Sequence, residues 1–243
     1  MMIEEIDQLL ANLKLKRMRE VVASELRRAA EKATAPDEVL LRLLRAQWAY
    51  AQERTAAHRL DAAKIPEKFD LGTFPYPSQP GVQRSQIEHL SHLEFLADGT
   101  NVVLIGEPGV GKTGIATGIL LKAVQAGYSG RFIKAQDLFD QMYASLADRA
   151  TRAYLNALAR LPLLVIDELA YLTLKPEQAN IFFRLMDLRY SGHKSTLITT
   201  NLGYDDWGRL LGAEDKAKAM LSRLRHRCVT IRIDGPTLRS PTG

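Results

Sequence analysis

A glycine-rich segment at residues 104–113 carries the residue types that bind a polyphosphate. It reads LIGEPGVGKT, and its glycines, lysine and threonine match the pattern G-x-x-x-x-G-K-[ST]. Glycines let the backbone turn its N–H groups toward phosphate oxygens, while the lysine adds a positive charge and the threonine hydroxyl can ligate Mg²⁺. The segment therefore predicts a nucleotide-binding loop made of Gly106, Glu107, Pro108, Gly109, Val110, Gly111, Lys112, Thr113 and Gly114.

The residues on either side of this loop support the interpretation. Residues 101–105 read NVVLI, an apolar run typical of a buried parallel strand. After the loop, apolar residues recur at helical spacing, at Ile115, Ile119, Leu120 and Val124. A strand, a loop and a helix in this order place the positive end of the helix dipole beneath the phosphates. This context disfavours the alternative, which is a glycine-rich turn with an incidental lysine.

Two acidic residues follow a second apolar run farther along the chain. Residues 163–166 read LLVI, and Asp167 and Glu168 come directly after them. At the carboxyl end of a buried strand, Asp167 can hold Mg²⁺ beside Thr113, while Glu168 can polarise an attacking water. Many strands end in acidic residues, so the pair gains its meaning from the phosphate-binding loop that precedes it.

Residues 195–200 read STLITT and predict another buried strand, which Asn201 follows. The amide could orient the attacking water or contact the γ-phosphate. The alternative is an asparagine that caps a turn before Leu202 and Gly203. Ligands bind at the carboxyl edge of parallel sheets, where Asp167 is also expected, and this shared position favours the functional role for Asn201.

The composition limits the class of protein. The chain has 243 residues, of which 46% are hydrophobic, enough for one good core and an appended helical piece. Its single cysteine, Cys228, excludes an internal disulfide and a cysteine-based zinc site. No apolar run approaches the roughly 18 residues of a membrane helix, and the acidic N-terminus is not a signal peptide. We expect a cytoplasmic protein without a membrane partner.

Positive charge gathers at the C-terminal end of the chain. The net charge is +5, and residues 216–243 contain a single acidic residue, Asp234. The basic residues there are Lys216, Lys218, Arg223, Arg225, Arg227, Arg232 and Arg239. Such a patch predicts a polyanion nearby, either nucleic acid or the phosphates of a nucleotide held by a neighbouring subunit.

The pattern of apolar residues indicates how the site is carried. After residue 80, apolar runs alternate with helical patterns, which is typical of a parallel α/β sheet, here of five strands at 102–105, 131–134, 162–166, 196–200 and 228–233. Before residue 66 the chain predicts helices only. One follows the apolar stripe Ile6, Leu9, Leu10, Leu13, Met18, Val21 and Val22, and the next runs from about residue 34 to about residue 63.

Three prolines within residues 69–80 indicate an extended connector between two domains. We therefore predict a helical N-terminal domain at 1–66, which contacts DNA, a partner or another subunit. A connector follows at 67–80, and a nucleotide-binding domain at 81–243. Basic residues interleaved with leucine also fit the alternative, an ordinary amphipathic N-terminal helix with one solvated face.

The motifs together resemble those of AAA+ ATPases of the initiator and helicase-loader group. The loop at 106–113, the acidic pair at 167–168, Asn201 and the later Ser222-Arg223-Leu224 carry this resemblance. More closely, nearly the whole chain resembles the IstB-like ATP-binding proteins, transposition helpers that bacterial insertion sequences encode beside their transposase. The most specific segments are LVIDELAYL and TTNLGYDDWGRLLGAEDKAKAMLSRLRHRCVTIRIDG.

The resemblance implies an activity and its partners. Relatives use ATP and Mg²⁺ to assemble as homo-oligomers on double-stranded DNA, largely without sequence preference, and direct the transposase to it. Lys112, Glu168 and Asn201 would then be catalytic, and Arg223 would complete the site of a neighbouring subunit. Further implied contacts are Arg239 to the nucleotide and Arg149, Arg152 and Arg160 to DNA.

Three alternatives stay open at this point. A DnaC-like helicase loader would share the ATPase core and differ in what its N-terminal helices bind. A small-molecule P-loop kinase is a different class, and nothing in the sequence resembles its acceptor-binding lid. For Arg223 the alternative is a solvated basic helix.

The chain departs from the family pattern at two places. Relatives often have histidine at position 114, and residues 235–243 match the family's terminal element only loosely.

Overall fold

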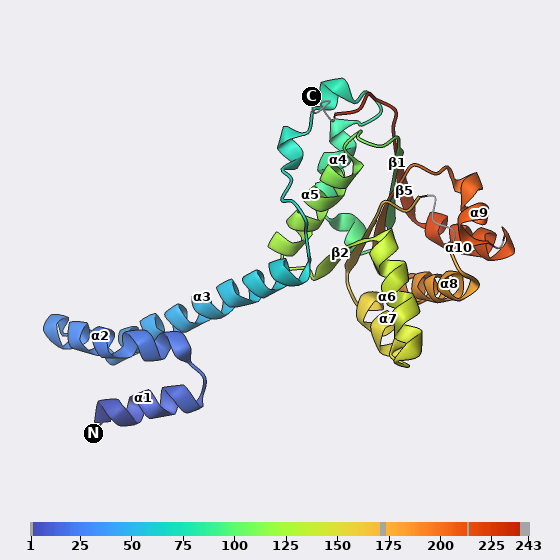
Figure 1. Ribbon diagram of the computed structural model, residues 1–243. Coiled ribbons are helices and arrows are strands. Elements are labelled where there is room, and N and C mark those ends of the chain that lie inside the picture. Colours follow the sequence, from blue (N-terminus) through green and yellow to red (C-terminus); the bar gives the residue numbers. More distant parts are fainter. Residues whose placement is uncertain (1, 171–173, 213, 239–243) are drawn as a thin grey trace, which may run out of the picture. The chain divides into compact units, whose positions relative to one another are not determined.

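The computed structural model describes residues 2–170, 174–212 and 214–238. For residues 214 and 216 it describes the backbone but not the side chain. It divides into two compact units, Met1–His58 and Arg59–Gly243 (Figure 1). The division falls inside helix α3 (Pro36–Ala62). The predicted domain limits at 66 and 80 stay a proposal, which limited proteolysis would test.

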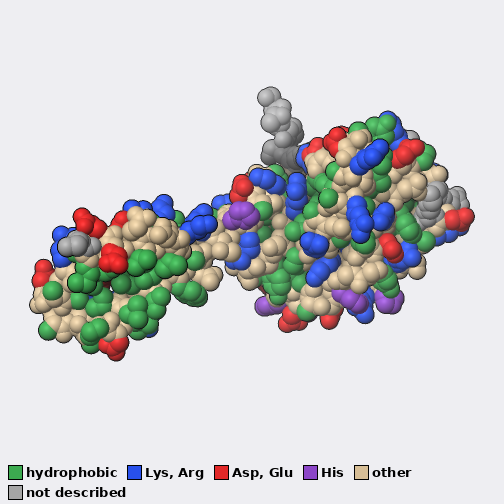
Figure 2. Space-filling view, turned by 90° about the horizontal axis from the view of Figure 1, so that it is seen from below, with side chains coloured by type: hydrophobic (Ala, Val, Ile, Leu, Met, Phe, Trp, Pro, Cys, Tyr) green, Lys and Arg blue, Asp and Glu red, His purple; other side chains and the backbone are tan. Residues whose placement is uncertain are grey.

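The N-terminal unit consists of helices α1 (Met2–Asn12), α2 (Lys16–Lys32) and the first part of α3. Its core is small and contains Leu10, Met18, Val22, Val39 and Leu43. Several large apolar side chains stay exposed, and Figure 2 shows hydrophobic groups at the surface of this unit; they include Leu9, Leu13, Leu40, Leu41, Leu44 and Trp48.

The prediction of one continuous helix through residues 6–22 is wrong. Lys14 has a φ of 58°, in the left-handed region, and separates α1 from α2. The N–H of Leu15 donates to the carbonyl of Leu10 at 2.9 Å, and the N–H of Lys14 donates to the carbonyl of Ala11 at 3.0 Å. This pair of bonds is a Schellman motif, which ends a helix and satisfies its last carbonyls. Leu15 then packs on the core that contains Leu10.

The second unit is built on a sheet of five parallel strands in the order β2-β3-β4-β1-β5. Their limits are β1 (Asn101–Gly106), β2 (Gly130–Lys134), β3 (Leu163–Asp167), β4 (Ser195–Thr200) and β5 (Cys228–Ile233). Each lies within a residue or two of its predicted range. The predicted parallel five-stranded α/β core, preceded by helices, is confirmed.

Helices cover both faces of this sheet, as Figure 1 shows. Along β1, Val102 and Leu104 pack toward α4 (Arg84–Ser91) and α5 (Lys112–Gln125). Val103 and Ile105 face the other layer. That layer consists of α6 (Ala135–Ala147), α7 (Thr151–Ala159), α8 (Pro176–Ser191), α9 (Trp207–Leu211) and α10 (Glu214–His226). Burial on both faces explains why β1 and β3 are apolar along most of their length. Within the described ranges, no helix is both long and apolar enough to span a bilayer.

The segment predicted to be an extended connector is folded onto the second unit. It contains two short 3-10 helices, Leu71–Thr73 and Tyr76–Ser78, and it buries Leu71 and Phe74. A Cβ at Gly118 of α5 would lie 2.6 Å from the Leu71 side chain, so the contact depends on that glycine. Proline spacing correctly excludes a long helix here, but it does not reveal the apolar contacts that hold the segment.

Candidate nucleotide-binding site

The glycine-rich loop joins the carboxyl end of β1 to the start of α5. Gly109 and Gly111 have φ values of 88° and 97°, a region that glycine adopts without steric cost. A Cβ at Gly106 would lie 2.4 Å from the carbonyl oxygen of Ile233, so the neighbouring strand leaves no room for a side chain. The loop ends directly at the N-terminus of α5. This helix has fourteen residues, and its dipole favours a bound anion.

Lys112 lies over this loop. Its Nζ donates hydrogen bonds to the carbonyls of Gly106 at 2.7 Å and Glu107 at 2.8 Å. Val110 is buried, whereas Glu107 and Pro108 are exposed. The loop therefore presents an ammonium group and a turn of backbone at one edge of the sheet, as the sequence predicts for phosphate binding.

The two predicted metal ligands meet at this edge. Thr113 Oγ1 donates to the carboxylate of Asp167, at 3.0 Å from Oδ1 and 3.1 Å from Oδ2. Asp167 is 1% exposed, and burial raises the pKa of its carboxyl group although hydrogen bonds from Thr199 and Thr113 act in the opposite direction.

A hydroxyl and a carboxylate are hard oxygen donors of the type that Mg²⁺ prefers. Among the residues that the structure describes, no group of three or more His, Cys, Asp or Glu side chains could hold a metal. Mg²⁺ is commonly held by one or two carboxylates together with substrate phosphates. Thr113 and Asp167 therefore fit an ion that arrives with the nucleotide.

Glu168 stands in a strained backbone conformation. Its φ is 59°, which is unusual for a residue other than glycine and concentrates at functional sites. Its N–H donates to Thr199 Oγ1 at 2.9 Å, and its carboxylate lies 3.4 Å from Lys134 Nζ. Lys134 ends β2 and pairs with Asp167 in the strand register. The carboxylate is about half exposed and can exchange this partner for water.

Asn201 follows β4 directly, and β4 lies between β1 and β3. The order of the strands thus places Asn201 between the loop and Asp167 along the carboxyl edge. Its Oδ1 is buried and has no hydrogen-bond partner among the described residues. A buried acceptor without a hydrogen-bond partner costs free energy. The free Oδ1 therefore indicates that another group donates a hydrogen bond to it.

Arg223 is not brought to this site. The carbonyl of its neighbour, Leu224, accepts a hydrogen bond of 3.1 Å from the side chain of Asn101, the first residue of β1. The loop begins at the other end of β1, about 16 Å away at the usual rise per residue. Arg223 instead lies against α8, with its Nε 3.3 Å from Asp187 Oδ1 and its guanidinium 5.2 Å from the centre of the Phe183 ring.

The three arginines predicted to contact DNA are exposed and lie around α7. Arg149 precedes this helix, Arg152 is in its first turn, and Arg160 follows its last residue. They are therefore available to a ligand but do not contribute to the nucleotide site. Arg239 lies outside the described residues.

Two further segments border the loop, and of these only the C-terminal one was linked to the nucleotide by the resemblance, through Arg239. The N–H of Leu238 donates to the carbonyl of Gly109 at 2.8 Å. A Cβ at Gly111 would lie 2.6 Å from the ring of Phe74, and one at Gly114 would lie 3.1 Å from the ring of Phe69. For the contact by Phe69 and Phe74, the sequence signal is the cluster of aromatic residues among the prolines at 69–80.

Thr199 and Lys134 are the other residues that the sequence did not identify. Thr199 Oγ1 donates to Asp167 Oδ1 at 2.6 Å and accepts from the N–H of Glu168, so one hydroxyl orients both acidic residues. Lys134 holds the carboxylate of Glu168. Both lie near the carboxyl end of a strand, but the sequence gives no signal of their partners.

The sequence profile of the IstB-like ATP binding protein family matches residues 8–242. The chain belongs to this family. A relative from Pseudomonas aeruginosa, named for the insertion sequence IS21 and for ATP binding, is 34% identical over 97% of the chain and 88% of its own length. A second relative, from Geobacillus stearothermophilus and named for insertion sequence IS5376, is 32% identical over 83% of the chain and 80% of its own length.

Solved structures place the fold of the second unit among AAA+ P-loop proteins. A crystal structure of the DnaC helicase loader is 25% identical, with a TM-score of 0.54, and covers 62% of this chain and 87% of its own. The replication initiator DnaA, bound to AMPPCP and single-stranded DNA, is 18% identical with a TM-score of 0.59. It covers 70% of this chain and 51% of its own. The predicted AAA+ fold and the predicted family are confirmed.

Proposed function

We propose that this protein is an ATPase that assembles as a homo-oligomer on double-stranded DNA and assists the transposase of an insertion sequence. The observation that carries the proposal is the convergence of the loop, Thr113, Asp167, Glu168 and Asn201 at one edge of the sheet in a chain of this family. Names of relatives that refer to insertion sequences and ATP support the assignment.

In this proposal each residue of the site has a separate role in ATP hydrolysis. The loop N–H groups and Lys112 bind the phosphates, and Thr113 and Asp167 hold Mg²⁺, which when bound neutralises charge on the phosphates. Glu168 exchanges Lys134 for the attacking water and polarises it, while the free Oδ1 of Asn201 accepts a hydrogen bond from that water. Arg223 of a neighbouring subunit stabilises charge on the transferring phosphoryl group.

DNA binding in this proposal is mainly to phosphates. The exposed arginines around α7, Arg149, Arg152 and Arg160, are suited to this contact. Little sequence preference follows, because phosphate contacts carry no base information. The residues at this site do not distinguish a transposition helper from a helicase loader; membership of the family favours the helper.

The first test uses Glu168→Gln, which removes the general base and keeps the shape of the side chain. Binding of ATP and of a random-sequence duplex should persist, while hydrolysis falls by a factor of about 10² or more. The complex on DNA should therefore be trapped and dissociate more slowly when excess ATP is present. Wild-type turnover by the glutamine variant would show that Glu168 is not the base.

A second measurement separates the two partners. The likeness to the DnaC helicase loader makes a replicative helicase the competing partner. Co-purification of the ATP-bound Glu168→Gln variant with a transposase encoded beside it, but not with a replicative helicase, is the expected result. The opposite preference would overturn the assignment to transposition and favour helicase loading.

A further inference from the structure

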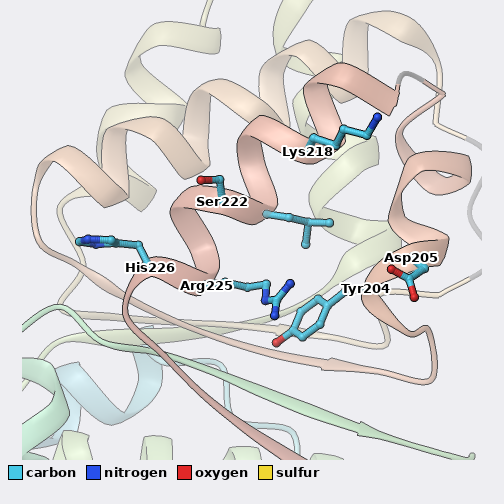
Figure 3. A pocket seen from close by; sticks show the side chains of 7 residues that line it. Tyr204, Asp205, Lys218, Ser222, Arg225 and His226 are labelled. Carbon is cyan, nitrogen blue, oxygen red and sulfur yellow. The ribbon is translucent and has the colours of Figure 1, made fainter.

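A depression of about 560 Å³ lies on the second unit between α10 and the short 3-10 helix Tyr204–Asp206 (Figure 3). The side chains that line it are Tyr204, Asp205, Lys218, Leu221, Ser222, Arg225 and His226. The lining residues from α10 recur at spacings of three or four, so they share one face of that helix; they are Lys218, Leu221, Ser222, Arg225 and His226. Most of the lining residues are exposed, and only the Tyr204 ring and Leu221 offer apolar contact.

Arg225 is held in place at one end of the depression without losing its hydrogen-bond donors. Its guanidinium lies 4.9 Å from the centre of the Tyr204 ring, and Figure 3 shows the two side chains pointing toward one another. Within the described ranges, no side chain forms an ion pair or a hydrogen bond with Arg225. A planar guanidinium stacked on a ring keeps its N–H edges directed outward, which suits a phosphate group.

Tyr204 is itself fixed. Its hydroxyl lies 2.7 Å from Thr230 Oγ1 on β5. Burial raises the pKa of Tyr204 to about 12, so the phenol stays neutral and does not repel an anion. The Tyr204 ring beneath Arg225 is therefore held by a hydrogen bond and uncharged at physiological pH.

Other basic residues near the C-terminal end are engaged elsewhere. Arg223 pairs with Asp187, and Arg227 donates to the carbonyl of Asp98 at 3.0 Å and contacts His193. The His226 ring lies 6.0 Å from that of Tyr190 and projects away from Arg225 in Figure 3. Of these side chains, Arg225 offers the donors for the polyanion that the charge pattern predicts.

We infer that this depression binds a backbone phosphate of duplex DNA, with Arg225 as the principal contact and Lys218 near a second phosphate. The two residues lie about two helical turns apart, roughly 10 Å along the axis of α10, so they would contact different phosphates. Asp205 lies on the opposite rim and opposes the binding of phosphate. This inference rests on the proposed DNA binding and adds a contact surface separate from the arginines around α7.

The test compares full-length variants in the binding of a labelled random-sequence duplex with a non-hydrolysable ATP analogue, over a range of salt concentrations. Arg225→Ala should weaken binding by about tenfold and should reduce the slope of log K against log salt by about 1 per bound subunit. Asp205→Asn removes the opposing charge at nearly constant shape and should strengthen binding, which a damaged fold would not do. Lys122→Ala, which removes one charge from the exposed surface of α5, is the matched control and should bind as the wild type does.

The outcomes separate this inference from the function on which it rests. Wild-type affinity and slope for Arg225→Ala would overturn the inference while leaving the proposed function standing. Failure of the wild-type protein to bind any duplex would overturn both. If Arg225→Ala instead loses ATPase activity without DNA and keeps its duplex affinity, the depression takes the phosphates of a neighbour's nucleotide, and the assignment to DNA is wrong.

Discussion

At the scale of single residues, one hydroxyl connects the side chain of Asp167 to the backbone of Glu168 in the candidate site. Thr199 Oγ1 donates to Asp167 and accepts from the N–H of Glu168, whose backbone is in the left-handed region. A non-glycine residue persists in that conformation only where its surroundings compensate the strain. Thr199 therefore acts as a positioning residue for both acidic groups.

The first prediction concerns this hydroxyl. Thr199→Val keeps the volume of the side chain but removes both hydrogen bonds, so kcat for ATP hydrolysis should fall by about tenfold or more. Thr199→Ser restores the hydroxyl and should recover most of the activity. Steady-state ATPase assays on the two variants check this. Equal rates for the valine variant and the wild-type protein would remove Thr199 from the catalytic arrangement.

A second prediction concerns the cost of burying Asp167. Because burial raises the pKa of its carboxyl group, the nucleotide-free protein loses stability as the pH rises from about 4 through that raised value, since the unfolded chain ionises first. Asp167→Asn cannot ionise, so its Tm at pH 7 should be higher than that of the wild-type protein.

The same variant separates stability from function. Its amide side chain lacks the charge that holds Mg²⁺, so Mg²⁺-ATP should stabilise the wild-type protein against heat more than it stabilises Asp167→Asn. Thermal unfolding with and without Mg²⁺-ATP measures both effects. A lower Tm for the nucleotide-free variant would show that the carboxylate contributes more through its hydrogen bonds than its desolvation costs.

The sequence predicts residues that are contiguous in a motif better than residues that meet across the sheet. The loop and the pair Asp167 and Glu168 are recognisable because their chemistry depends on fixed local spacing. Lys134 and Thr199 act through the register between neighbouring strands, and an isolated lysine or threonine at the end of a strand carries no signal of its partner.

At the scale of elements, the strands were predictable because burial on both faces requires apolar runs of a limited length. The end of α1 was not predictable, because Lys14 supplies a left-handed residue where glycine or asparagine is the usual signal. The apolar stripe continues from α1 into α2, so hydrophobic periodicity does not show the break. What decides it is the packing of Leu15 on the small core around Leu10.

One buried cation connects three elements behind the site. Arg189 of α8 is 1% exposed and donates hydrogen bonds to the carbonyls of Leu158, Leu161 and Ser195 and to Thr196 Oγ1. Burial lowers its pKa to about 9, so the side chain stays charged at pH 7. These bonds tie the end of α7 to α8 and to the start of β4.

Arg189→Met should therefore destabilise the protein strongly. The substitution leaves several buried acceptors without donors, which costs at least ~3 kcal/mol. The Tm should fall by roughly 6 °C or more. Arg184→Met on the same helix is the matched control, because Arg184 is exposed, and it should leave Tm nearly unchanged. If both variants melt at the wild-type temperature, the buried network does not contribute to stability.

At the scale of the whole molecule, Arg223 and the phosphate-binding loop of the same chain lie near opposite ends of β1. The end of α10 is held at the amino end of β1 through Asn101, whereas the phosphate-binding loop follows the carboxyl end of the same strand. An arginine side chain is too short to bridge that distance within one chain. If Arg223 contributes to hydrolysis, it must exchange its contact with Asp187 for a phosphate held by another subunit.

The last prediction tests this action between chains. Arg223→Ala leaves the loop of its own subunit intact, so it should bind ATP but lose most of its hydrolysis, and Arg223→Lys should restore little because lysine lacks the planar fork that pairs with phosphate oxygens. Lys112→Ala should be inactive for a different reason, since its own loop is impaired. When the two alanine variants are mixed, some interfaces join an intact loop to an intact Arg223, and ATPase activity should partly return. If the variants co-assemble, as a labelled pull-down would show, and no activity returns, then Arg223 does not act on a neighbour's nucleotide.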